Sequence, residues 1–286
     1  PQTPVGFADV ARSVVVIVAV GGVTTLGGIL TGRVGFFGVF TLWWFLVVVG
    51  LPVQSGASLG WVLVRWRGRR VTGPAGVALV LGLLAGAIGV WGSVIEPYRL
   101  EVDRPARLAL PETRAGSDPL RIGVLTDLQT IHVGDHEKRA VDLLMAERPD
   151  LILLPGDVFQ GSREQFDREL PALQELFGRL HAPGGVFLVH GDVDPLLRVN
   201  EDSDGPMPAV PTLDEVVRGT DVQVLRQEVV FTRVGDRMVQ IAGSLLDPGP
   251  DATRALVEQF SQSPEVVRIL LAHRPGFVAP TLAARK

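Results

Sequence analysis

The chain has 286 residues, no cysteine and a formal net charge of −4, a length that accommodates about two domains of ordinary size. The absence of cysteine excludes disulfides, thiolate metal sites and a cysteine nucleophile. Of the 27 basic and 31 acidic residues, residues 1–97 hold six arginines and two acids, which leaves 21 basic and 29 acidic residues for the remainder. Because nucleic-acid binding requires a basic surface, the acidic remainder argues against a nucleic-acid partner and is compatible with a cation site.

Three apolar segments, at about residues 10–30, 34–53 and 75–95, are long enough to cross a bilayer, which takes about 20 helical residues. Glycine is frequent in them, as in transmembrane helices that pack closely. The alternative for the first segment is a secretory signal peptide, but two further apolar segments follow it. The sequence therefore predicts a membrane domain over residues 1–97 with about three transmembrane helices.

The orientation of this domain follows from its arginines. The cluster at residues 65–70 lies between the second and third apolar segments and indicates a cytoplasmic loop, which places the acidic part outside the cytoplasm. Arginines that follow the third segment favour the opposite orientation. Residues 98–119 are rich in proline and charge, so we expect a linker with one short strand.

From residue 120 onward, apolar runs of strand length alternate with helical patterns. We expect helices at residues 137–147, 165–180, 213–217 and 252–262. We expect strands at residues 120–125, 151–155, 185–189, 222–225, 228–233, 237–242 and 266–271. This alternation predicts an α/β domain, and a hairpin turning at Gly235 and Asp236 predicts an antiparallel part.

A potential ligand follows the end of four of these strands. Asp127, Asp157 and Asp192 follow the first three, and His273 follows the last. Because ligand sites in open α/β folds lie at the carboxyl ends of strands, we expect these side chains to lie close together. Three crowded carboxylates repel one another unless a cation neutralises them, so the pattern predicts a metal site. The alternative for each aspartate is a cap of a helix or turn.

These residues stand in an order that resembles a known family. The blocks read Asp127-Leu-Gln129, Gly156-Asp157, Gly191-Asp192-Val193-Asp194 and His273. They resemble the D-x-H, G-D, G-N-H-D and lone-histidine blocks of the calcineurin-like metallophosphoesterases. Over residues 120–286, with apolar segments in front, the chain is most similar to the bacterial branch in which transmembrane helices precede the domain. The resemblance implies an αββα sandwich after the membrane helices, in the bacterial cell membrane.

The resemblance also implies a site and an activity. Two divalent ions, of manganese, iron or zinc, would be held by a set of five residues, namely Asp127, Gln129, Asp157, Asp192 and His273. The expected function is that of a membrane-anchored phosphoesterase that hydrolyses a phosphomonoester, phosphodiester or pyrophosphate by a metal-bridged hydroxide. The anchor indicates a phosphorylated substrate at the bilayer, such as a lipid-linked one.

The chain departs from the family pattern at three positions. Gln129 and Val193 replace histidines, and Asp192 replaces an asparagine. Val193 has no proton to give, so no catalytic group is assigned; Asp194 is the one candidate, and the alternative is that it shapes its loop. The alternative function is therefore a catalytically inactive phosphoesterase-fold protein that binds a phospholipid or a protein partner.

Two further expectations concern missing ligands. Only 13 residues follow His273, so we expect the family's final G-H-x-H block to lie beyond Lys286 and the site to be incomplete in the chain as given. His132 lies in the same loop as Gln129, where it is either a solvated histidine or a replacement for the lost imidazole.

We expect His190 to pack beside the third strand and His181 to lie in an exposed turn.

Overall fold

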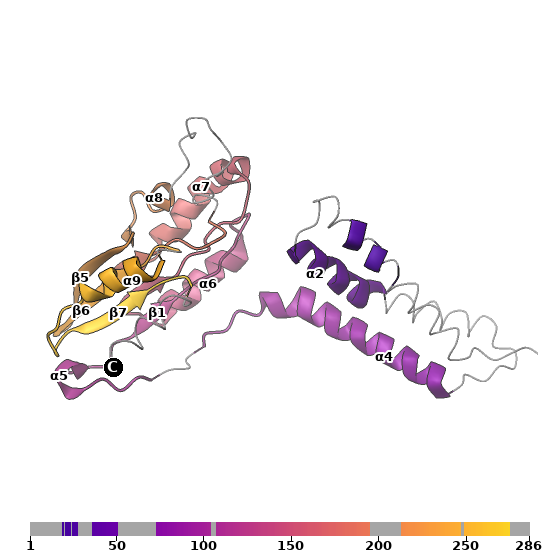
Figure 1. Cartoon of the computed structure of the whole chain (residues 1–286), viewed down its shortest axis with the longest axis horizontal. Helices are drawn as coiled ribbons and strands as arrows, with labels where there is room; N and C mark the ends of the chain where they lie inside the picture. The colour runs from indigo at the N-terminus through magenta and orange to yellow at the C-terminus, as the bar shows by residue number, and fades with distance from the viewer. Residues whose placement is uncertain are drawn as a thin grey trace, which may run out of the picture. The chain divides into compact units, whose positions relative to one another are not determined.

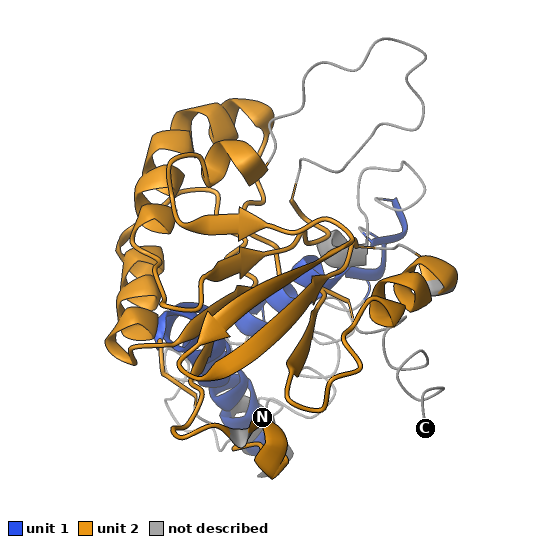
Figure 2. Cartoon of the chain, turned by 90° about the vertical axis from the view of Figure 1, so that its left-hand side faces the viewer, with its two compact units in different colours: residues 1–99 blue, residues 100–286 orange. Residues whose placement is uncertain are grey.

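The computed structural model describes residues 19, 21–23, 25–27, 36–50, 73–103, 107–194, 213–246 and 249–274. The chain forms two compact units, Pro1–Arg99 and Leu100–Lys286, which are drawn in different colours in Figure 2.

The two longer described stretches of the first unit each form an apolar helical segment. Helix α2 (Phe36–Phe45) continues into the π-helical turn η1 (Leu46–Gly50), and α4 (Gly73–Val90) continues into η2 (Trp91–Ile95) and η3 (Glu96–Tyr98). The two segments pack closely because Gly89 leaves room for the side chain of Val48. Trp44 Nε1 also donates a hydrogen bond to Ser93 Oγ over 2.8 Å.

One helix among the described residues, Val80–Tyr98, is long and apolar enough to cross a membrane. Leu81 and Ile88 on this helix are more than half exposed, and exposed apolar surface of this kind suits lipid contact. The second expected span corresponds to a shorter apolar helix, Val39–Gly50. The first expected span falls mostly outside the described residues.

The linker contains a short helix where we expected a strand. Helix α5 spans Glu112–Ala115, and the described part of residues 98–119 holds no strand. Pro111 precedes the helix as its N-cap residue and, lacking an N–H, is poorly suited to a sheet. Within the second unit, this segment contacts the mixed-sheet region, since Thr113 Oγ1 donates to Pro264 O over 3.2 Å and the Arg237 guanidinium donates to Asp118 O.

The second unit begins with a parallel sheet. Strands β1 (Ile122–Val124), β2 (Leu151–Leu154), β3 (Val186–Leu188) and β4 (Val222–Val224) lie in this order and are all parallel. Every residue of β2 and β3 is buried, as expected for continuous apolar runs in the middle of a parallel sheet.

Among the described residues, three helices lie between the parallel strands along the chain. They are α6 (Asp135–Ala146), α7 (Arg163–Gly178) and α8 (Leu213–Val216). A capping box starts α7, where Ser162 and Gln165 cap each other, and α6 starts after Gly134, whose N–H donates to the Glu137 carboxylate. The apolar faces of these helices pack against the sheet in one core cluster, in which Phe166 and Leu173 are fully buried.

The second sheet is mixed. Strands β5 (Glu228–Val234) and β6 (Arg237–Gly243) are antiparallel, and β6 pairs in parallel with β7 (Val267–Leu271). The β5–β6 hairpin turns at Gly235 and Asp236 as expected, and Gly235 takes a φ of 60° there, which glycine adopts without steric strain.

Two further core clusters hold the unit together. One contains residues of both sheets, including Leu153 and Phe187 of the first sheet and Ile241 of the second. The other joins β6 to helix α9 (Gly249–Glu258), whose Leu256 and Val257 are buried; the helix lies over this sheet in Figure 1. The α/β class and the alternation of strands and helices expected from the sequence are confirmed.

Candidate metal centre

The segments that follow β1 and β2 run side by side and carry the first two candidate ligands. Asp127 N donates to Gly156 O over 3.2 Å, and Gln129 N donates to Asp157 O over 2.8 Å. A parallel bridge between Thr130 and Phe159 continues this pairing. The two aspartates are therefore held at one edge of the sheet by the backbone.

Three of the predicted site residues have a left-handed backbone. The φ angles are 54° at Asp127, 41° at Gln129 and 58° at Asp157. A non-glycine residue in this region costs about 1–2 kcal/mol, although aspartate tolerates it better than most. Backbone strain of this kind clusters at functional sites, where it aims a side chain.

Two glycines allow the loops after β2 and β3 to approach each other. A Cβ atom on Gly156, which has a φ of 101°, would collide with the backbone of Gly191. A Cβ atom on Gly191 would collide with the carboxylate of Asp157. Side chains at either position would force the loops apart and move Asp157.

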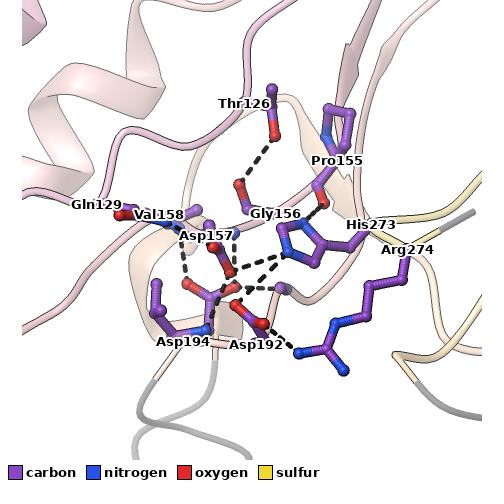
Figure 3. A network of polar contacts seen from close by, with 12 residues as sticks. Thr126, Gln129, Pro155, Gly156, Asp157, Val158, Asp192, Asp194, His273 and Arg274 are labelled. Carbon is purple, nitrogen blue, oxygen red and sulfur yellow. Dashed lines mark hydrogen bonds and ion pairs between the residues drawn. The ribbon is translucent and has the colours of Figure 1, made fainter. Parts of the chain in front are cut away.

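Asp127, Asp157 and His273 converge at this edge of the sheet. A potential ligand atom of each lies within 4.8 Å of those of the other two. His273 Nε2 lies 3.5 Å from Asp157 Oδ1 and 3.6 Å from Asp192 Oδ1 (Figure 3). Asp157 is almost completely buried, with 1% of its surface exposed, so a cation among these side chains would offset the repulsion between carboxylates.

The orientation of His273 suits a metal ligand. Its Nδ1 atom lies 2.9 Å from the carbonyl oxygen of Pro155. Because a carbonyl can only accept, Nδ1 is the donor in this contact, and a neutral ring in this orientation turns the lone pair of Nε2 toward the two aspartates. Histidines that bind metals are commonly fixed by a hydrogen bond of this kind.

Asp192 is held by an arginine that the sequence did not lead us to expect. The Arg274 guanidinium donates a hydrogen bond to Asp192 Oδ2 (Figure 3). This hydrogen bond is the main reason that the pKa of Asp192 lies below its ordinary value. The carboxylate therefore stays ionised, with Oδ1 on the side of His273. The only sign of Arg274 in the sequence is its position directly after His273, which follows the end of a strand.

Gln129 reaches the cluster through its amide nitrogen. Its Nε2 atom donates to Asp157 Oδ2 over 2.9 Å, and the Val193 N–H donates to Asp157 Oδ1 over 3.0 Å. A half-turn of the amide would exchange its nitrogen for its oxygen. Gln129 is thus in contact with the cluster, but the group that it presents is a donor rather than the expected ligand oxygen.

Asp194 organises the loop after β3. Its carboxylate accepts four backbone hydrogen bonds, from Asp157, Val158, Phe159 and Gly191, over 2.7–3.3 Å. It is 1% exposed, and burial raises its pKa against the opposing effect of these hydrogen bonds. These contacts agree with the loop-shaping alternative for Asp194.

The remaining histidines lie apart from the cluster. His132 pairs with Glu169 of α7 over 3.0 Å, and its side chain is 74% exposed. His181 is exposed, as expected. His190 is buried beside β3, also as expected, and desolvation, aided by the charge of Arg226, lowers its pKa to about 4.

The donor set fits a divalent metal. Among the described residues, one group of three could hold such an ion, and it combines two carboxylates with an imidazole nitrogen, a mixture that manganese, iron and zinc accept. A comparison with models of protein families found no match to this sequence, and a comparison with curated proteins found none either.

Proposed function

We propose that this chain is a membrane-anchored, metal-dependent phosphoesterase of the calcineurin-like type. The observation that carries the proposal is the convergence of Asp127, Asp157 and His273, each placed by the end of a different strand, with the imidazole fixed by Pro155 O. The order of packing, from α6 and α7 through the two sheets to α9, supports an αββα sandwich.

The chain's own residues supply binding and orientation. Asp127, Asp157 and His273 would hold one ion. A second ion would be held by the carboxylates of Asp157 and Asp192, which both lie beside His273 Nε2, because the single lone pair of Nε2 binds one ion only. When bound, such ions draw charge from phosphate oxygens and lower the pKa of a water nucleophile. Gln129 and the Val193 N–H orient the Asp157 carboxylate.

The anchor places the reaction at a bilayer in this proposal. Helix Val80–Tyr98 meets the length and composition of a membrane span, and the arginine cluster at residues 65–70 favours a second unit outside the cytoplasm. A phosphorylated molecule linked to a lipid would then be within reach of the site.

The proposal is tested with the full chain in detergent micelles. Metal is removed with a chelator and manganese, zinc or iron is added back, and hydrolysis of p-nitrophenyl phosphate, bis-p-nitrophenyl phosphate and pyrophosphate is measured. We expect activity that depends on the metal, and a loss of at least 100-fold in Asp157→Asn, as expected for a residue that contacts the reacting centre. Asp251→Asn is the matched control, since Asp251 is an exposed residue of α9. A metal-loaded protein that cleaves none of the three esters would contradict the proposal.

A second candidate is a phosphoesterase fold that binds its ligand without turnover. The observation in its favour is that both oxygens of Asp157 already accept hydrogen bonds, from Gln129 and from the Val193 N–H. This candidate predicts a purified protein without stoichiometric metal. It also predicts unchanged biological activity in Asp157→Asn, and a wild type that holds stoichiometric metal together with loss of activity in Asp157→Asn would exclude it.

A further inference from the structure

One cationic side chain touches the carboxylate cluster within the part of the chain that the structure describes. Arg274 follows His273 directly and donates to Asp192 Oδ2, and its side chain is 48% exposed. Asp192 in turn lies 3.6 Å from His273 Nε2 through its other oxygen. The guanidinium thus lies at the exposed margin of the cluster, one carboxylate away from the proposed metal ligands.

The charges of the cluster make this cation important for an anionic substrate. When only the ion held by Asp127, Asp157 and His273 is bound, the three carboxylates of Asp127, Asp157 and Asp192 carry more negative charge than that ion neutralises. A phosphate group that approaches such a site meets residual repulsion unless a further positive charge faces it. Val193, which follows Asp192, offers only an apolar side chain there, and its N–H is directed to Asp157.

We propose that Arg274 binds the phosphate group of the substrate, and that it makes the site selective for phosphomonoesters and other terminal phosphates over phosphodiesters. This inference rests on the proposed phosphoesterase function. Arg274 contacts the substrate, whereas Asp192 holds the guanidinium in place through Oδ2 and faces the metal position through Oδ1.

The geometry of a guanidinium explains the choice of substrate. It carries five N–H donors in a planar fork, so it can contact Asp192 and a phosphate at the same time. A terminal phosphate has three non-bridging oxygens, enough for two contacts with the fork and one with a metal. A diester has two, which the fork and the metal must share.

The test uses binding of inorganic phosphate, the product of monoester hydrolysis, to the full chain in detergent micelles. Calorimetric titrations first measure manganese binding alone and then phosphate binding at saturating manganese. We compare the wild type with Arg274→Gln, with Arg274→Lys, and with Arg254→Gln as the control on the exposed face of α9. Rates for p-nitrophenyl phosphate and bis-p-nitrophenyl phosphate are measured in parallel.

We expect Arg274→Gln to bind manganese within about threefold of the wild type and phosphate roughly 10- to 100-fold more weakly, because a charged hydrogen bond is lost. Its kcat/KM should fall more for the monoester than for the diester. Arg274→Lys should lie between the wild type and the glutamine variant, and the control should match the wild type.

Two results would overturn the inference while leaving the proposed function intact. One is unchanged phosphate affinity in Arg274→Gln at saturating manganese, which would limit Arg274 to holding Asp192. The other is an equal loss of rate for both esters. Failure of the wild type to bind manganese would instead overturn the proposed function, and the inference with it.

Discussion

At the scale of the residue, a methyl group added at Gly191 tests whether the close approach of this glycine to Asp157 positions the carboxylate. In Gly191→Ala the new Cβ would meet the Asp157 carboxylate. We expect the variant to lose about 1–3 kcal/mol of unfolding free energy, as in other overpacked sites, and to bind manganese more weakly. Urea unfolding should be followed by far-UV circular dichroism rather than by tryptophan fluorescence, because all five tryptophans lie before residue 100 and none reports on the second unit.

Gly178→Ala is the control for this prediction, since a Cβ there comes no closer than 3.9 Å to Thr220 Cγ2. It should leave manganese binding unchanged. Equal behaviour of the two alanine variants would show that the contact between the loops does not position Asp157.

Glu169 gives a prediction for the dependence of stability on pH. It accepts hydrogen bonds from His132 and from Val133 N, and these lower its pKa from the ordinary value of 4.5, with His132 as the main cause. A carboxyl group whose pKa is lowered by folding stabilises the protein above its unfolded pKa, and this contribution is lost as the pH falls through the folded value.

Glu169→Gln should therefore be less stable than the wild type at pH 7, and the difference should shrink once the pH falls below about 4.5. Thermal unfolding from pH 3 to pH 7 measures this difference in stability, with Glu258→Gln near the end of α9 as the control. A difference that stays constant over this range would mean that the ionised form of Glu169 makes no contribution.

Several site residues could be predicted from the sequence because each is a local feature. Asp127, Asp157 and Asp192 directly follow apolar strands, and parallel strands bring such positions to one edge. Arg274 was not predicted in this way, because an arginine is not a metal ligand and its position after His273 does not reveal its contact with Asp192, 82 positions away. Nor does the sequence reveal which atom of Gln129 faces Asp157, since that depends on the local hydrogen bonds.

At the scale of the element, α7 stabilises the first sheet through one apolar face. Leu173 and Phe166 on this face are completely buried. We expect Leu173→Ala to lose about 2–5 kcal/mol of unfolding free energy because it leaves a cavity. Leu108→Ala is the control, since Leu108 is 84% exposed. Far-UV circular dichroism in urea measures both, and a loss below about 1 kcal/mol in Leu173→Ala would show that α7 contributes little.

Most elements of the second unit could be predicted because their patterns are strong. The buried run at residues 151–154 and the hairpin at Gly235 were expected within one or two residues of their observed positions. The helix at Glu112–Ala115 was missed. It has a single turn, too short for an apolar period, and its contact with Pro264 depends on residues more than 150 positions away.

At the scale of the whole molecule, the chain forms two compact units, and in the proposed function the first would anchor the chain and the second would bind the metal. The apolar helix Val80–Tyr98 belongs to the first unit, whereas all candidate ligands belong to the second. The fragment of residues 100–286 should therefore be recovered without detergent and should keep its sheet content and manganese binding. Fractionation, circular dichroism and metal titration check this, with the full chain as the reference. A fragment that unfolds or requires detergent would show that the second unit depends on the first.

The convergence of Asp127, Asp157 and His273 is tested most directly by locating bound manganese. Crystals of the full chain grown with manganese would give anomalous difference density at the metal. We predict a manganese peak within bonding distance of one oxygen each of Asp127 and Asp157 and of Nε2 of His273. No such peak is expected in Asp157→Asn. A wild-type protein with no manganese at this position, or with manganese bound elsewhere, would contradict the account.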